Sequence, residues 1–195
     1  MRVGVVVALG SLLLLGACGG DGAGRGPRPT STVVASPGAA VRLQPLEAGR
    51  DVLAPDGWYT LRIPLDWTQA DSPISETAVQ SPAGDDRLTL NVSREELDGI
   101  TQPQAYLEST RRQINLLYRN VLPISMAPVM VGDVSAYRWM YTATVSGQQR
   151  LIYQVFIVNQ GTGLVLTGLA PSNASYDETR ETFDAIVGTL RFGRG

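Results

Sequence analysis

The sequence contains no histidine and no lysine, and its only cysteine is Cys18. Without histidine, neither a Ser-His-Asp triad nor a Cys-His pair can form, and zinc sites built from cysteine and histidine are excluded as well. One cysteine cannot form an intramolecular disulfide. Because these absences remove the commonest nucleophilic and zinc-dependent chemistries, we expect no catalytic residue, no metal site and no cofactor.

Basic charge is also scarce. All 16 basic residues are arginine, against 18 acidic residues, which gives a net charge of −2 at pH 7. A nucleic-acid-binding protein uses a basic surplus to neutralise phosphates. The charge balance therefore argues against a nucleic-acid partner.

The beginning of the chain has the pattern of an export signal. Arg2 is followed by an uncharged apolar run over residues 3–15, which is shorter than the roughly 20 residues of a membrane-spanning helix. One leucine and two small residues then lead into Cys18, and this order resembles the lipobox of bacterial lipoproteins. We expect residues 1–17 to be a lipoprotein signal peptide and Cys18 to carry the lipid anchor. The alternative is a plain secretory signal that happens to end in cysteine.

The next segment, residues 18–50, is rich in Gly, Pro, Ser, Thr and Ala and has few large apolar side chains. Such a segment cannot bury enough apolar surface to offset the entropy of ordering it. We predict a lipidated, flexible tether that holds the protein at the extracytoplasmic face of a cell membrane. Val41 and Leu43 alternate with polar residues as a short strand would, but Pro45 interrupts the pattern.

Residues 51–195 are predicted to form one globular domain. Alternating apolar residues predict strands at 57–64, 76–80, 88–93, 134–145, 151–158, 164–170 and 190–192. Apolar spacing predicts a helix over 101–119 with Thr101 as its cap, and a second helix that starts at the Ser175–Glu178 capping box and ends at Gly188. Strands, helix, meander and helix in this order indicate an α+β fold with an antiparallel β-sheet flanked by helices.

Apolar and aromatic patterns across this domain resemble one known group of proteins. A strand that starts at Tyr59 ends in Pro-x-x-Trp at Trp67, a meander rich in Tyr and Trp follows the middle helix, and the last helix carries Phe183-x-x-Ile186-Val187. Over residues 51–192 these features resemble the PsbP-like fold and its bacterial lipoprotein relatives of the DcrB and LpqN type. The resemblance implies an α/β/α sandwich. It also implies a family that mostly binds or assists other proteins, or binds lipids or glycans, without catalysis.

Two pairs of carboxylates, Asp85–Asp86 and Glu95–Glu96, are of the residue type that glycoside hydrolysis uses. The first pair lies in a predicted turn and the second at a predicted strand exit. Solvated charge is the ordinary explanation at both places. A carboxylate-dependent hydrolase is therefore the least favoured function, and we predict that the protein is not an enzyme.

Aromatic residues of the predicted meander are the candidates for a ligand or partner surface. Trp139 and Tyr141 share one face of a strand, with Tyr153 expected near them on the next strand. Such side chains stack on glycans or anchor partners, or they fill the core beneath a helix, which the apolar character of this face favours. The opposite face, with Arg138 and Gln154, is the better candidate surface if no helix covers it.

The first predicted helix combines an apolar and a basic face. Leu107, Ile114 and Leu117 recur at helical spacing, as expected for the side that packs on the core. Arg111–Arg112 and Arg119 form a basic stripe. A stripe of this kind is usually the solvated face, and it is also a candidate contact for anionic lipid headgroups.

From these observations we expect an exported lipoprotein, anchored in the membrane through Cys18, whose domain is a non-catalytic binding or accessory module for an envelope protein. The alternative is a carrier or binder of lipid or glycolipid in an apolar pocket between sheet and helix. Neither function is tied to a specific ligand by the sequence.

The anchor can be tested by Cys18→Ser, which removes the thiol that the acyl chains need. We expect the wild-type chain to begin at Cys18 and to carry acyl mass, and the variant to keep its leader and carry none. Intact-mass spectrometry of membrane-extracted protein measures both properties, and Ser36→Ala in the predicted tether is the control. Normal processing and unchanged envelope retention of Cys18→Ser would contradict the anchor.

Overall fold

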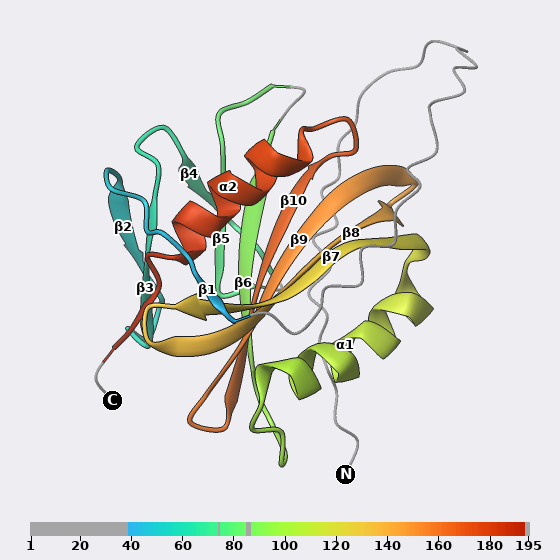
Figure 1. The fold of residues 1–195 in the computed structure, drawn as a ribbon. Helices are drawn as coiled ribbons and strands as arrows, with labels where there is room; N and C mark the ends of the chain where they lie inside the picture. The colour runs from blue at the N-terminus through green and yellow to red at the C-terminus, as the bar shows by residue number, and fades with distance from the viewer. Residues whose placement is uncertain (1–38, 74, 85–86, 194–195) are drawn as a thin grey trace, which may run out of the picture.

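The computed structural model describes residues 39–73, 75–84 and 87–193. These residues form an eight-stranded sheet, a three-stranded sheet and two helices (Figure 1). The elements are β1 (Val41–Arg42), β2 (Arg50–Leu53), β3 (Tyr59–Ile63), β4 (Thr68–Ala70), β5 (Thr77–Gln80), β6 (Thr89–Glu96), α1 (Pro103–Leu117), β7 (Arg119–Val131), β8 (Val134–Val145), β9 (Gln148–Asn159), β10 (Thr162–Pro171), α2 (Tyr176–Val187) and β11 (Arg191–Phe192). Within these ranges, neither helix has the length and apolar character needed to cross a membrane.

The large sheet has the strand order β1-β7-β8-β9-β10-β6-β5-β4, and the small sheet has the order β11-β3-β2. Strands β7 to β10 form a meander in which each strand pairs antiparallel with the next. Ser146 and Gly147 at one hairpin, and Gln160 and Gly161 at the next, all have positive φ angles, as two-residue type I′ turns require. The predicted α+β fold with an antiparallel sheet is confirmed, apart from a two-residue parallel pairing of β1 with β7.

The two helices cover opposite faces of the large sheet (Figure 1). Even-numbered residues of β8 such as Met140 belong to a core cluster that includes α2 and the small sheet, and odd-numbered ones such as Trp139 belong to a cluster that includes α1. Alternate side chains of a strand point to opposite faces of its sheet. The central strands are therefore buried on both sides, as an α/β/α sandwich requires.

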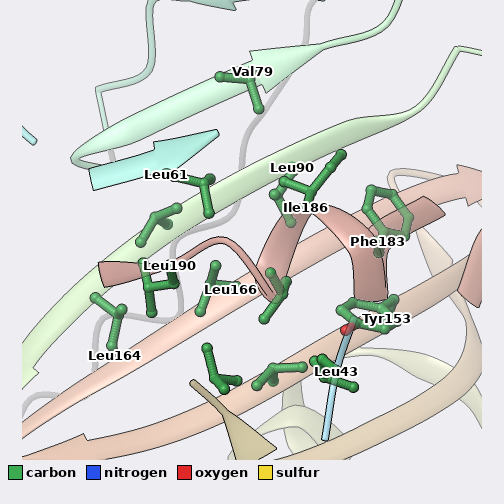
Figure 2. Packing of buried hydrophobic residues seen from close by; sticks show 14 of the residues in the cluster. Leu43, Leu61, Val79, Leu90, Tyr153, Leu164, Leu166, Phe183, Ile186 and Leu190 are labelled. Carbon is green, nitrogen blue, oxygen red and sulfur yellow. The ribbon is translucent and has the colours of Figure 1, made fainter. Parts of the chain in front are cut away.

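Strand β10 carries one glycine on each face, and each glycine receives an aromatic ring from the helix above it. A Cβ atom at Gly163 would lie 2.7 Å from the ring of Tyr106 in α1, and one at Gly168 would lie 2.7 Å from the ring of Phe183 in α2. Figure 2 shows Phe183 and Ile186 of α2 among the apolar side chains of the sheet. Because glycine has no side chain, it lets both helices pack close to the same strand.

The described fold begins earlier than Asp51, which corrects the end of the predicted tether. Val41–Arg42 forms β1, the side chain of Leu43 is only 4% exposed, and the Leu46 N–H donates to the Ala185 carbonyl at 2.8 Å. The weak alternation around Leu43 was thus a real strand signal. The predictions for residues 1–38, among them the signal peptide and Cys18, lie outside the described residues.

A strand occupies the segment around Pro123 and Pro128, where the prolines predicted only an extended passage. Strand β7 is 13 residues long and contains both. Proline lacks the N–H that a central strand needs and is tolerated at a sheet edge. Both prolines precede Val129 and Met130, the residues that pair with β1, so they lie where β7 is the edge of the described sheet.

The helix caps were predicted with unequal success. The Ser175 hydroxyl accepts a hydrogen bond from the Glu178 N–H at 3.4 Å, which confirms this half of the capping box. Thr101 is not the cap of the first helix. Helix α1 begins at Pro103 with Gln102 at the cap, and no side-chain hydrogen bond caps it. Proline has no backbone N–H, so the first position of the helix has one fewer donor that needs a capping acceptor.

Because α2 packs close to β10 at Gly168, adding a methyl group at this position should destabilise the protein. Gly168→Ala should lower the free energy of unfolding by about 1–3 kcal/mol, because the added Cβ overlaps the buried ring of Phe183. The control is Gly84→Ala, where a Cβ would meet no atom within 4 Å, and its effect should stay within about 0.5 kcal/mol. Urea unfolding of the purified proteins measures both. Equal stability of the two variants would show that α2 does not depend on this glycine.

Candidate functional site

The aromatic candidates lie in the core. The side chain of Trp139 is 1% exposed, and those of Tyr141 and Tyr153 are 0% exposed. Of the two alternatives, a ligand or partner surface and a core beneath a helix, their burial agrees with the core, which the apolar character of this face favoured. The cause is the covering of both sheet faces, which leaves no open face over β8 and β9.

The register between β8 and β9 also separates the aromatic residues. Tyr153 pairs with Met140, and Gln154 pairs with Trp139. Directly paired residues share a face, so Tyr153 lies on the α2 side and Gln154 on the α1 side, the reverse of the prediction. Trp139 and Tyr141 stack beneath α1 with ring centroids 4.0 Å apart, and the Tyr141 hydroxyl donates to the side-chain oxygen of Gln154 at 3.1 Å.

Arg138 is covered by α2 and forms no open surface. Its guanidinium Nη1 contacts Oδ2 of Asp184 in α2, and the two side chains are 14% and 18% exposed. The Tyr153 hydroxyl donates to Oδ1 of Asp184 at 2.7 Å. Burial, followed by the nearby Asp184 carboxylate, raises the pKa of Tyr153 well above its ordinary value, so the phenol keeps the proton that it donates. These three side chains connect β8, β9 and α2.

The second carboxylate pair lies at the end of β6, beside a hollow of about 270 Å³ that is lined by Arg94, Glu95, Glu96 and Thr162. The Tyr106 hydroxyl donates to Oε1 of Glu95, and burial raises the pKa of Glu95. Glu96 is exposed. Consecutive strand residues leave the strand on opposite faces, so the two residues reach the hollow from different sides of β6, and Oε1 of Glu95 is already occupied by the Tyr106 hydroxyl.

The remaining acidic candidates do not add a catalytic or metal site within the described part of the chain. Asp85 and Asp86 lie outside the described residues. Among residues 39–73, 75–84 and 87–193, no three His, Cys, Asp or Glu side chains come together as metal ligands.

Exposed apolar side chains are concentrated where α1 ends and β7 begins. Leu116 is 86% exposed, Leu117 is 56% exposed and Leu122 is 53% exposed. Arg112 and Arg119 are exposed on the same segment. These five residues do not form one surface. Arg119 and Leu122 pair with Thr144 and Thr142 of β8 and so lie on the α2 side of the sheet, whereas the other three belong to α1 on the other side. The sequence identified both arginines as part of a basic stripe and assigned Leu117 to the core-facing side, but Leu117 is 56% exposed.

The half-buried Arg138–Asp184 pair predicts a loss of stability when one charge is removed. Asp184→Asn leaves the guanidinium of Arg138 without its counter-charge and should cost about 2–4 kcal/mol. The matched control is Glu108→Gln, which breaks the exposed Arg111–Glu108 pair and should cost no more than about 0.5 kcal/mol. Chemical unfolding at constant pH measures the difference. Similar costs for both variants would mean that the link between β8 and α2 is not needed.

No family model and no curated protein sequence matches this chain. Solved structures do match. The solution structure of cyanobacterial PsbP (CyanoP) from Synechocystis sp. PCC 6803 superposes with a TM-score of 0.57 at 15% identity and covers 86% of this chain and 100% of that chain. The Ran-binding protein Mog1p of Saccharomyces cerevisiae gives a TM-score of 0.56 at 10% identity, with 74% and 95% covered. LpqN of Mycobacterium tuberculosis, involved in cell envelope biogenesis, gives 0.49 at 21% identity, with 73% and 89% covered.

At sequence identities this low, a structural match shows a shared fold and does not show a shared functional site. The match to CyanoP spans that whole protein, and it agrees with the layers, strand meander and closing helix described above. This chain therefore has the PsbP-like fold.

Proposed function

We propose that this chain is an exported lipoprotein, anchored in the membrane through Cys18, whose domain acts as a non-catalytic binding or accessory module for another protein of the cell envelope. The observation that carries the proposal is the structural use of the polar side chains at the candidate positions. Arg138, Asp184 and Tyr153 bind one another between sheet and helix, and Glu95 binds the hydroxyl of Tyr106.

Catalysis finds little support in the same geometry. The sequence has no histidine or lysine to act as a general base or nucleophile. Glu95 and Glu96 occupy consecutive positions of β6 and face opposite sides of the strand. The carboxylate of Glu95 is held by Tyr106 in a structural contact, which speaks for a binding role over a catalytic one.

Binding of a protein is favoured over carriage of a lipid because the spaces between sheet and helices are filled. Phe183 and Ile186 of α2 are 0% exposed, and Leu107 and Ile114 of α1 are also 0% exposed. An apolar pocket for an acyl chain would need one of these layers to be open. The Ran-binding protein Mog1p, which shares the architecture, is an example of this fold in a protein-binding role, and this likeness is an analogy of fold alone.

The proposal can be tested with a variant that removes all four candidate carboxylates: Asp85→Asn, Asp86→Asn, Glu95→Gln and Glu96→Gln. Glutamine at position 95 retains an oxygen that accepts from Tyr106. We expect chemical crosslinking in intact cells to give the same defined envelope-protein adduct for this variant as for the wild type. Cys18→Ser, which removes the proposed anchor, should lower the yield of that adduct.

A hydrolase would behave differently. Turnover of an envelope glycan by the purified wild-type chain, abolished in the four-carboxylate variant, would overturn the proposal. Absence of any defined adduct from wild-type cells would overturn it as well.

A further inference from the structure

We infer that two prolines of β7, Pro123 and Pro128, together with two bulges beside them, keep the edge of this strand from pairing with a second copy of the chain. The inference concerns self-association, goes beyond the proposed binding function and does not depend on the anchor at Cys18. It starts from an unpaired length of strand. Strand β7 has 13 residues, but β1 pairs only with Val129 and Met130, and the preceding part has no strand partner on that side among the described residues.

The composition of β7 makes its edge a hazard. Its only charged side chain is Arg119, and most of the others are apolar. Segments of high β-propensity and low net charge pair readily with other chains when their N–H and C=O groups are left open at the edge of a sheet. Every copy of the chain carries the same edge, so two copies could join across a two-fold axis. Without protection, β7 would therefore favour self-association.

The first proline to consider, Pro128, stands where β7 faces away from β8. The Met130 carbonyl accepts a hydrogen bond from the Leu43 N–H at 2.9 Å, so Met130 directs its backbone groups to the outer edge. Along an antiparallel pair, residues alternate between bonding to the partner strand and facing the other side. Pro128, two residues before Met130, therefore also faces the outer edge, where it offers no N–H.

Pro123 occupies the same kind of position. It pairs with Tyr141 of β8, and Pro128 pairs with Tyr137. These two tyrosines are four residues apart on β8, which pairs with β9 without a register shift, so the alternation gives both prolines the same outward direction. Among the outward-facing positions that pair with β8 within residues 123–128, Met126 alone retains an N–H. An incoming strand would thus find one donor where a regular edge offers a row of them.

Two bulges distort the same part of the strand. The register of β7 on β8 shifts between Arg119 and Leu122, and Asn120 within this stretch has a φ angle of 55°. A second shift falls between Pro123 and Ser125. A bulge adds an unpaired residue, bends its strand and increases the local twist. A twisted, bent edge is a poor template for a further strand, so the bulges act in the same direction as the prolines.

The remaining edges of the described sheets are short. Strand β4, at the opposite edge of the large sheet, has three residues, and the small sheet ends in β2 with four residues and β11 with two. Short edge strands present few pairing groups and are themselves a protection against association. Within the described fold, the prolines and bulges therefore lie at the edge that is long enough to need them.

The inference can be tested by combining Pro123→Val with Pro128→Val, which restores both N–H groups in a residue that favours strands. Full-length protein is purified in detergent and examined by sedimentation equilibrium at matched detergent density, with micelles in excess over protein. The matched control combines Pro55→Val with Pro82→Val. It makes the same chemical change at two exposed prolines that lie outside the strands.

We expect the wild type and the control to remain monomers over a concentration range in which the edge variant forms dimers or larger species. The association constant of the edge variant should be at least about tenfold higher, because each copy regains hydrogen-bond donors along β7. Hydrogen exchange locates the contact. Backbone amides of residues 121–130 should exchange more slowly in the edge variant as its concentration rises, whereas their exchange in the wild type should not depend on concentration.

A monomeric edge variant with native near-UV circular dichroism would overturn the inference. Association of the edge variant without slower exchange in residues 121–130 would place the contact elsewhere and would overturn it too, as would equal association of the control. A wild type that already self-associates through these residues would show that the edge is not protected. If the double variant does not fold, Pro128→Val alone provides the test, with a smaller rise in association expected and an unchanged monomer as the contradicting result.

Discussion

The structure depends on the burial of the central meander from both sides. Strand β9 is buried without interruption from Leu151 to Ile157, so neither face of the sheet can remain open to water. Helix α1 covers one face, and α2 together with the small sheet covers the other. Because both helices must approach the same sheet, β10 has a glycine under each: Gly163 beneath Tyr106 and Gly168 beneath Phe183. Two-sided coverage is the constraint from which the remaining features follow.

One consequence is that polar side chains on the central strands become part of the architecture. Arg138 projects from β8 into the layer beneath α2, where an unpaired guanidinium would be costly. Asp184 supplies the counter-charge from the helix, and the hydroxyl of Tyr153 occupies the second carboxylate oxygen. A buried pair of this kind adds little net stability over apolar packing, but the loss of one member is expensive. The pair therefore joins α2 to β8 at one position. Both sheet faces over these strands are therefore covered in the described part of the chain.

The sequence predicted features that are set by neighbouring residues, and it missed those that depend on another strand or helix of the fold. Alternation over 134–145 gave the correct faces within β8, and the Ser175 cap was predicted correctly, because both are set by neighbouring residues. The register that puts Tyr153 opposite Met140 depends on how two strands slide past each other, which alternation in either strand does not determine. The three-residue strand β4 carries too few residues for a pattern. Asp184 gave no signal, since an acid beside the apolar stripe of a helix is usually solvated.

Leu117 shows how the same distinction affects the surface. Its spacing on α1 is that of a core residue, yet it is 56% exposed at the last position of the helix. Tyr118, the next residue, packs against the cluster beneath α1 instead. Helical spacing predicts which side of a helix faces the core, but it holds only as far as the helix continues, and the exact end of a helix is the part that a pattern defines least well. The chain leaves α1 directly into β7, so the last apolar position of the helical pattern is taken over by the tyrosine that starts the turn into the strand.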